Sequence, residues 1–153
     1  MPMYNNTLSL AQIALLFDEG GFQQTWEKAF FGLCLYAGCR PKQACTLLTE
    51  DGFGVLGRVR PTLLIRAENS KLRRDREIPI HSRLREYLEA YGCPDQRYKY
   101  LFPGRDKGHI HLLDTQLILY RACDRVGIPS LSIHCFRHTF AHTLLSKLRS
   151  GEL

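Results

Sequence analysis

A cluster of histidine and arginine near the end of the chain is its most chemically suggestive feature. His134, His138 and His142 stand four residues apart, with Arg137 between the first two. On a helix, His134, Arg137, His138 and Ala141 share one face. Arginine and histidine near a helix start suit an anion such as phosphate, whereas a cation beside a metal site disfavours the metal. We therefore favour phosphate binding over the alternative, a metal site built from the three histidines.

Two further cationic residues lie far from this cluster in the sequence. Arg40 follows an apolar helix, and a buried guanidinium needs an anionic or carbonyl partner, so a structural ion pair and a functional role both stay open. Lys71 lies in the stretch 58–76, which holds seven basic and two acidic side chains. Such a cluster attracts a phosphate backbone, although solvated charge runs without a partner are about as frequent.

The composition limits what kind of protein this is. With 153 residues, 44% hydrophobic and 24% charged, the chain fits one globular domain. It contains no apolar run of the roughly 20 residues that a membrane-spanning helix needs, so we expect a soluble intracellular protein. Its six cysteines match no zinc spacing and are expected to be reduced thiols.

Helices are expected on both sides of a small sheet. The first is capped by Ser9 or Thr7 and ends at Phe17, and the second starts at about Phe22 and leads to Arg40. The last is expected from Ile133 to about Leu148, with Ser132 as its cap. Its core-packed stripe would consist of Phe136, Phe140, Thr143 and Leu144. The remaining expected elements are helices at 41–48, 84–91 and 112–126, and strands at 53–59, 62–66 and 77–80, with a basic turn at 69–75.

One motif is misleading. Residues 52–57 have the spacing G-x-G-x-x-G of dinucleotide-binding loops. That loop requires a strand before it and a helix after it, whereas here a helix precedes and a strand pattern follows. We interpret these glycines as turns of a hairpin.

Four segments in order carry a resemblance to a known family. Residues 36–40 (YAGCR) resemble the segment with the first catalytic arginine of tyrosine recombinases, also called phage integrases. Residues 69–71 (NSK) and 76–80 (REIPI) resemble the hairpin with the catalytic lysine. Residues 101–104 (LFPG) resemble the element before the last large helices, and 134–141 (HCFRHTFA) resemble the H-x-x-R box.

This resemblance implies an α+β, mostly helical catalytic-domain fold with a small three-stranded antiparallel sheet. It implies that Arg40, Lys71, His134 and Arg137 converge on one DNA phosphate. The neighbouring cations Arg73, Arg74, Arg76 and His138 are then expected to contact DNA.

The chain departs from the family pattern in two respects. Gln43 stands three residues after Arg40, where the family usually has an acidic residue. All seven tyrosines precede the H-x-x-R box, so none fits the place of the nucleophile. We therefore expect residues 1–153 to be a single partial catalytic domain, without the N-terminal DNA-clamping domain and the C-terminal nucleophile segment.

The reaction implied by the resemblance is site-specific DNA recombination through a 3′-phosphotyrosine, with no metal or nucleotide cofactor. Double-stranded DNA is the expected partner, and the expected location is the cytoplasm, at the nucleoid. A complete protein would form a tetramer on DNA, whereas this fragment is expected to be a monomer that binds DNA phosphate without cleaving it. Two alternatives are a non-catalytic DNA-binding or regulatory remnant of a mobile element, and a metal-dependent hydrolase using the three histidines.

Overall fold

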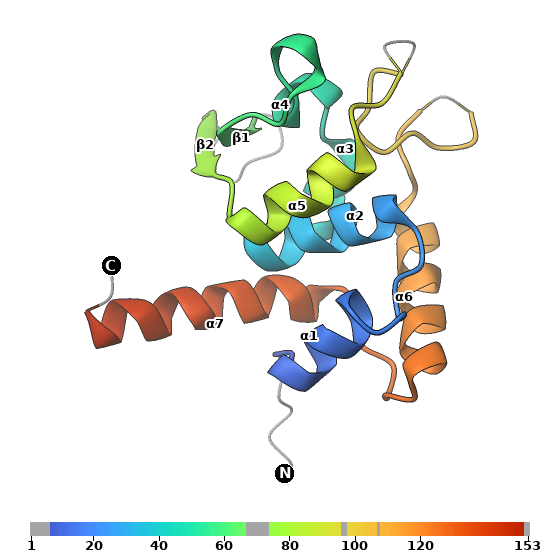
Figure 1. Ribbon diagram of the computed structural model, residues 1–153, viewed down its shortest axis with the longest axis vertical. Helices are drawn as coiled ribbons and strands as arrows, with labels where there is room; N and C mark the ends of the chain where they lie inside the picture. The colour runs from blue at the N-terminus through green and yellow to red at the C-terminus, as the bar shows by residue number, and fades with distance from the viewer. Residues whose placement is uncertain (1–6, 67–73, 96–97, 107, 152–153) are drawn as a thin grey trace.

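Helices dominate the computed structural model, which describes residues 7–66, 74–95, 98–106 and 108–151 (Figure 1). The α-helices are α1 (Leu10–Phe17), α2 (Thr25–Tyr36), α3 (Pro41–Thr46), α4 (Thr49–Gly52), α5 (Ser82–Tyr91), α6 (Leu112–Val126) and α7 (His134–Ser150). The other elements are the 3-10 helix η1 (Val55–Gly57) and the strands β1 (Thr62–Ile65) and β2 (Arg76–Pro79). Helix α2 lies at the centre and packs against α5 and α7.

The first helix begins where the sequence predicts. The Ser9 hydroxyl accepts a hydrogen bond from the backbone N–H of Gln12 at 3.1 Å, and the Gln12 side chain accepts one from the Ser9 N–H at 2.9 Å. Two otherwise unpaired N–H groups are thereby satisfied at the helix start. The second helix begins at Thr25 rather than at about Phe22, because Phe22 lies in a turn and its N–H donates to the Leu16 carbonyl at 2.7 Å.

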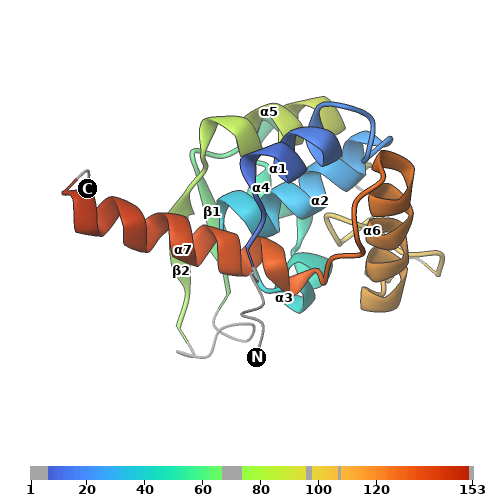
Figure 2. The same ribbon diagram turned by 90° about the horizontal axis from the view of Figure 1, so that it is seen from below.

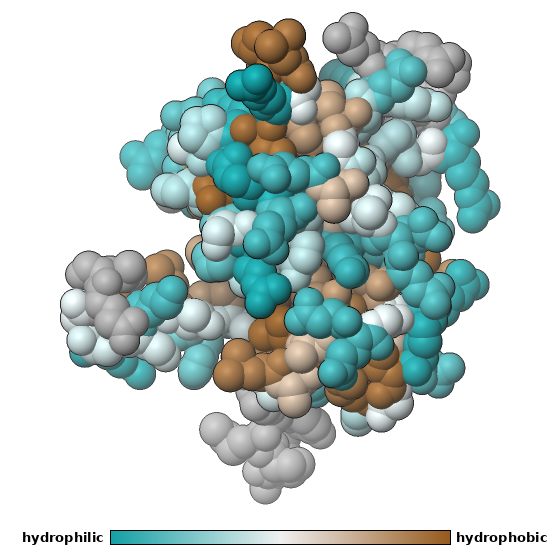
Figure 3. Space-filling view, viewed as in Figure 1, coloured by the Kyte–Doolittle hydropathy of each residue, from teal (hydrophilic) through white to brown (hydrophobic). Residues whose placement is uncertain are grey.

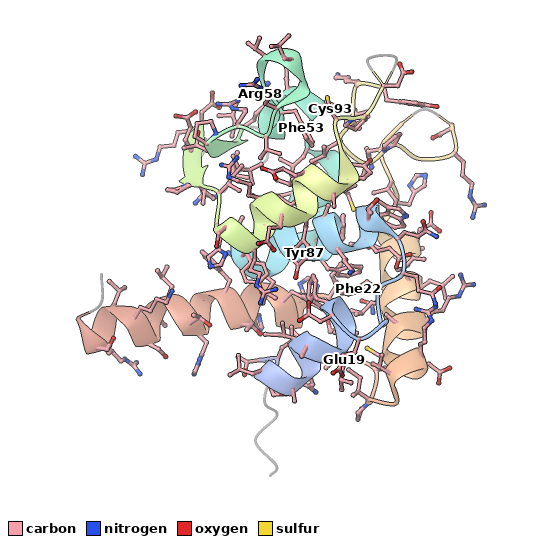
Figure 4. All side chains as sticks on the ribbon, viewed as in Figure 1. Glu19, Phe22, Phe53, Arg58, Tyr87 and Cys93 are labelled. Atoms are coloured by element: carbon pink, nitrogen blue, oxygen red, sulfur yellow. The ribbon has the colours of Figure 1, made fainter. Side chains whose placement is uncertain are left out.

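An aromatic cluster forms the centre of the core. Phe22 stacks on Phe31 with ring centroids 4.6 Å apart, and Phe17 stacks on Tyr87 at 5.2 Å. Phe136 of α7 lies 5.2 Å from Phe31. Figure 4 shows Phe22 and Tyr87 in the interior, with Glu19 at the surface. Burial of these rings is the main force that attaches α7 to the body of the molecule.

The predicted apolar stripe of α7 is correct only in the first half of the helix. Phe136 is fully buried and Phe140 is half-buried, but Thr143 and Leu144 are exposed. The reason is geometric, since the C-terminal half of α7 extends beyond the other helices (Figure 2). Thr139, which was not predicted to be buried, is instead enclosed, and its hydroxyl accepts the Leu8 N–H at 2.7 Å.

The described residues form a sheet of two strands, so the prediction of three is wrong. β1 and β2 pair antiparallel, with Thr62 opposite Pro79 and Ile65 opposite Arg76. The segment predicted as the first strand folds back on itself, with one bridge between Phe53 and Val59.

The loop 53–59 folds this way because of its glycines. The Gly54 N–H donates to the Arg58 carbonyl at 2.7 Å, and Gly57 has a φ of 70°. Leu56 also has a positive φ, 62°, and Val55 and Leu56 are 83% and 85% exposed at the tip. Figure 3 shows this tip as a brown projection at the top of the molecule. Helix α4 precedes this loop, the short η1 lies within it, and strand β1 follows, which is not the strand-loop-helix order of a dinucleotide site.

Ion pairs attach the strands to α4. The Arg66 guanidinium bonds Asp51 at 2.8 Å and Glu50 at 3.0 Å, and Arg60 bonds Glu77 at 2.8 Å. The Asp51 side chain is buried, so removal of Arg66 would leave a buried carboxylate without its cationic partner. These pairs hold the start of β2 in place.

None of the described helices is both long and apolar enough to cross a membrane. All six cysteines are free, and burial raises the pKa of Cys39 and of Cys45 to about 12. At neutral pH these two thiols are therefore protonated and unreactive.

Candidate phosphate-binding site

The site begins at the turn after α2. Gly38 has a φ of 68°, a conformation that side chains with a Cβ rarely adopt. A Cβ at this position would lie only 2.4 Å from Cδ1 of Phe140. Glycine is therefore required for both the turn and the close approach of α7.

This turn also orients the arginine of the H-x-x-R box. The Nε of Arg137 donates to the Gly38 carbonyl at 3.2 Å. No hydrogen bond to the two terminal nitrogens of Arg137 occurs within the described part of the chain. The guanidinium is thus fixed by one edge, while the other edge can donate two hydrogen bonds to an anion.

Arg40 is positioned by the start of α3. It is the N-cap residue of this helix, and Pro41 occupies the first helical position. The Gln43 side chain accepts the Arg40 backbone N–H at 2.9 Å. Gln43, which stands where the family usually has an acidic residue, therefore keeps the hydrogen bond that caps the helix. It places a neutral group beside Arg40.

A third arginine joins these two. Arg76 is the first residue of β2, opposite Ile65 of β1. Together with Arg40 and Arg137 it lines one cavity of about 660 Å³. His138 and Gln43 also line the cavity, and its apolar wall includes Ile78, Phe140, Leu144 and Leu145.

The three arginines carry an excess of positive charge. Burial, followed by the charges of Arg40 and Arg76, lowers the pKa of Arg137. None of the described residues that line the cavity is acidic. The mutual repulsion of the guanidinium groups makes the cavity favourable for an anion, which would relieve it.

The other predicted site residues have different placements. His134 is exposed at the first position of α7 and does not line the cavity; its N–H donates to the Ser132 hydroxyl at 3.3 Å. Arg74 is exposed. Lys71 and Arg73 lie outside the described residues, so the structure does not place them.

Sequence reasoning identified Arg76 as a DNA-binding residue but did not group it with Arg40 and Arg137. The available signal was strand alternation, because Arg76 and Ile78 lie on the same face of β2 and both line the cavity. The roles of Gly38 and Phe140 were not predicted, since they depend on contact between segments 99 and more residues apart.

No group of three or more histidine, cysteine, aspartate or glutamate side chains that could hold a metal ion occurs among the residues the structure describes. The guanidinium groups of the cavity are not metal ligands, because they carry a permanent charge and no free lone pair. The arrangement is instead suited to a phosphate or another oxyanion.

One protein family matches nearly the whole chain. Residues 7–149 match the Phage integrase family. A search of curated proteins found no match.

Several solved structures share the fold. The integrase from mycobacterium phage Brujita is 26% identical, with a TM-score of 0.62 over 95% of this chain and 44% of that one. XerA recombinase is 22% identical, with a TM-score of 0.71 over 99% and 50%. XerH site-specific recombinase bound to difH substrate is 16% identical, with a TM-score of 0.71 over 93% and 43%.

This chain thus spans half or less of the length of each of these three proteins. The family match nevertheless covers nearly all of it, including the turn at Gly38, both strands and the cavity-lining part of α7. The chain belongs to the phage integrase family, whose structural neighbours here are tyrosine recombinases.

Proposed function

We propose that this chain is part of the catalytic domain of a site-specific DNA recombinase and binds a phosphodiester of double-stranded DNA. The observation that carries the proposal is the convergence of Arg40, Arg76 and Arg137, from three separate elements, on one cavity without an acidic neighbour among its described lining residues. Planar guanidinium groups donate paired hydrogen bonds that match the oxygens of a phosphate.

The chemistry follows from the charge that develops during strand cleavage. A tyrosine hydroxyl attacks phosphorus, the new phosphotyrosine bond forms, and the bond to the 5′-oxygen breaks. Negative charge accumulates on the non-bridging oxygens in the transition state, where Arg40 and Arg137 would stabilise it. Lys71 would protonate the leaving 5′-oxygen, and His134 would assist proton transfer at the nucleophile or bond the phosphate.

This stretch of the protein would bind DNA without cleaving it. No tyrosine is among the described residues that line the cavity. The reaction would require a tyrosine from elsewhere, and no metal ion or nucleotide enters the scheme.

Two structural neighbours that were solved with DNA support DNA as the partner. XerH was solved bound to its difH substrate, and the Tn1549 transposon integrase was solved in complex with circular intermediate DNA. For this protein we infer assembly into a tetramer on DNA in its complete form, at the nucleoid of the cytoplasm. Arg73, Arg74 and His138 would add contacts to the DNA backbone, and the isolated chain would be a monomer in dilute solution.

Binding is tested by the salt dependence of affinity for a duplex. Each phosphate contact that is lost should weaken binding and reduce the slope of log K against log salt by about one unit. We expect this for Arg40→Ala, Arg76→Ala and Arg137→Ala, measured by fluorescence anisotropy. The control is Arg58→Ala, which removes one equal charge at the loop tip, across α5 from α7 (Figure 4). Equal slopes for all four variants would contradict the proposal.

Cleavage is tested separately with a nicked duplex and a denaturing gel that detects covalent protein–DNA adduct. We expect adduct only when the chain is extended to include a downstream tyrosine, and none after Lys71→Ala in that extended protein. Adduct from residues 1–153 alone would overturn the proposed absence of a nucleophile. Binding without adduct from the extended protein would favour a non-catalytic DNA-binding remnant.

A further inference from the structure

Helix α6 carries an apolar stripe that the body of the molecule does not cover. Leu113, Leu117 and Tyr120 are 84%, 46% and 46% exposed. Their spacing of four and then three residues places them on one side of the helix, and Asp124 continues the same spacing. This is the heptad spacing of a helix that packs along a second helix.

A groove runs beside this stripe. It has a volume of about 420 Å³ and lies between α6 and the loop before it, with Trp26 of α2 on its other side. Its α6 wall consists of Asp114, Leu117, Ile118 and Arg121, and its opposite wall includes Trp26, Pro103 and Ile110. The stripe is therefore continuous with a concave, partly apolar surface into which another helix could fit.

Three charged side chains line the groove: Asp114 and Arg121 on α6, and Arg105 on the loop opposite. The two on α6 indicate what would fit along this helix. Asp114 and Arg121 are seven residues apart, so they lie two turns apart on the same line of the helix. Neither side chain has a hydrogen bond or an ion pair with the residues the structure describes. Two copies of α6 running antiparallel, with their twofold axis near Leu117, would place Asp114 of each copy opposite Arg121 of the other. The surface is thus complementary to itself, as an interface with twofold symmetry requires.

We propose that α6 is a docking surface for a second copy of this chain, with the two α6 helices packed antiparallel along Leu113, Leu117 and Tyr120. Two aspartates and two arginines form two equivalent ion pairs along one edge of the seam. One helix against one helix buries less than the roughly 1,200 Å² of ordinary stable interfaces, so the association is weak. It is compatible with a monomer in dilute solution.

The position of α6 leaves the arginine cavity open. In Figure 1, α6 stands at one edge of the molecule, whereas β2 and the projecting half of α7 lie at the other. A dimer through α6 would therefore present two separate phosphate-binding cavities on its outer sides. The inference does not depend on the proposed DNA binding.

Charge exchange tests the arrangement. Sedimentation velocity of the chain without DNA, from about 10 μM to about 1 mM, should show a concentration-dependent dimer, because weak interfaces give dissociation constants in the upper part of this range. We expect Asp114→Arg and Arg121→Asp each to reduce dimerisation at least about tenfold, since each places like charges opposite each other. The double variant Asp114→Arg/Arg121→Asp should restore it. Glu86→Arg on α5, with the same change in net charge as Asp114→Arg, should have no effect.

A cross-link provides a second measurement that does not rely on charge. In a Cys93→Ser background, Leu117→Cys should form an intermolecular disulfide at high concentration, because the two copies of position 117 lie next to the twofold axis. Leu10→Cys, an exposed position on α1, should not. A wild-type chain that stays monomeric at 1 mM, or a double variant as defective as the single ones, would overturn the proposal.

Discussion

At the residue scale, the candidate site depends on a position that has no side chain. The Gly38 carbonyl accepts a hydrogen bond from the Nε–H of Arg137. The backbone of Gly38 lies so close to the Phe140 ring that a Cβ would overlap with it. The backbone of one segment therefore fixes the direction of a cationic side chain on another.

Gly38→Ala should destabilise the chain by about 2–5 kcal/mol. The positive φ costs roughly 1–2 kcal/mol for alanine, and overlap with Phe140 adds about 1–3 kcal/mol. Urea denaturation measures the loss. Gly127→Ala is the matched control, because Gly127 has a similar φ of 74° but nothing within 4 Å of the added Cβ, so only the first cost applies. Equal losses for the two variants would show that the Phe140 contact is unimportant.

A second residue-scale prediction concerns Gln43. Gln43→Glu keeps the cap on the Arg40 N–H and adds a negative charge beside the three arginines. We expect a higher melting temperature in low-salt buffer and a smaller further rise on addition of sulfate, because the carboxylate replaces the anion. Gln12→Glu is the control, since Gln12 has the same capping role at the start of α1. If sulfate raised the melting temperature of Gln43→Glu as much as that of the wild type, the idea that the three arginines carry an unbalanced positive charge would be contradicted.

At the element scale, we expect the start of α5 to lose stability in acid because of His81. The Nδ1 of His81 accepts the Arg83 N–H at 3.0 Å, and the ring stacks on Tyr36 at 4.8 Å. Burial, followed by the charges of Lys147 and Arg83, lowers the pKa of His81 from its ordinary value of 6.5. The folded chain therefore binds this proton less readily than the unfolded chain.

The sign of the effect follows from linkage. Stability supported by neutral His81 is present above pH 6.5 and is lost as the pH falls through 6.5 toward the lower folded pKa. His81→Asn retains an N-cap that cannot titrate, so its unfolding free energy should depend less on pH between about 7 and 5. His142→Asn, at an exposed position on α7, is the control for loss of one histidine. A pH profile identical to wild type for His81→Asn would disprove the assignment.

Comparison of the predicted helices and strands with those of the structure shows which features a sequence pattern can predict. The capped start of α1 and the bounds of α6 are local, because side-chain hydrogen bonds and helical spacing determine them. The strand predicted at 53–59 failed because alternation cannot distinguish a strand from a loop closed by Gly54 and Gly57. The stripe of α7 failed beyond Phe140 because sequence spacing does not reveal where the body of the molecule ends.

At the scale of the whole molecule, the family and the main cationic residues could be predicted from the sequence. The arrangement of these cationic residues relative to one another in space could not. Arg40 and Arg137 were recognised from the segments around them, and they do line one cavity. Arg76 was not grouped with them, because its place depends on the pairing of β1 with β2 and on the ion pairs that attach β1 to α4. Such contacts arise only when the complete fold is assembled.

The connections that complete the cavity span most of the chain. Arg137 reaches Gly38 across 99 residues, and Thr139 reaches Leu8 across 131. During synthesis on the ribosome, the first arginine segment emerges long before its partner helix exists. The nascent chain therefore carries an incomplete arginine cavity until α7 has been translated and released from the exit tunnel, and the proposed affinity for nucleic acid would arise late in the production of this protein.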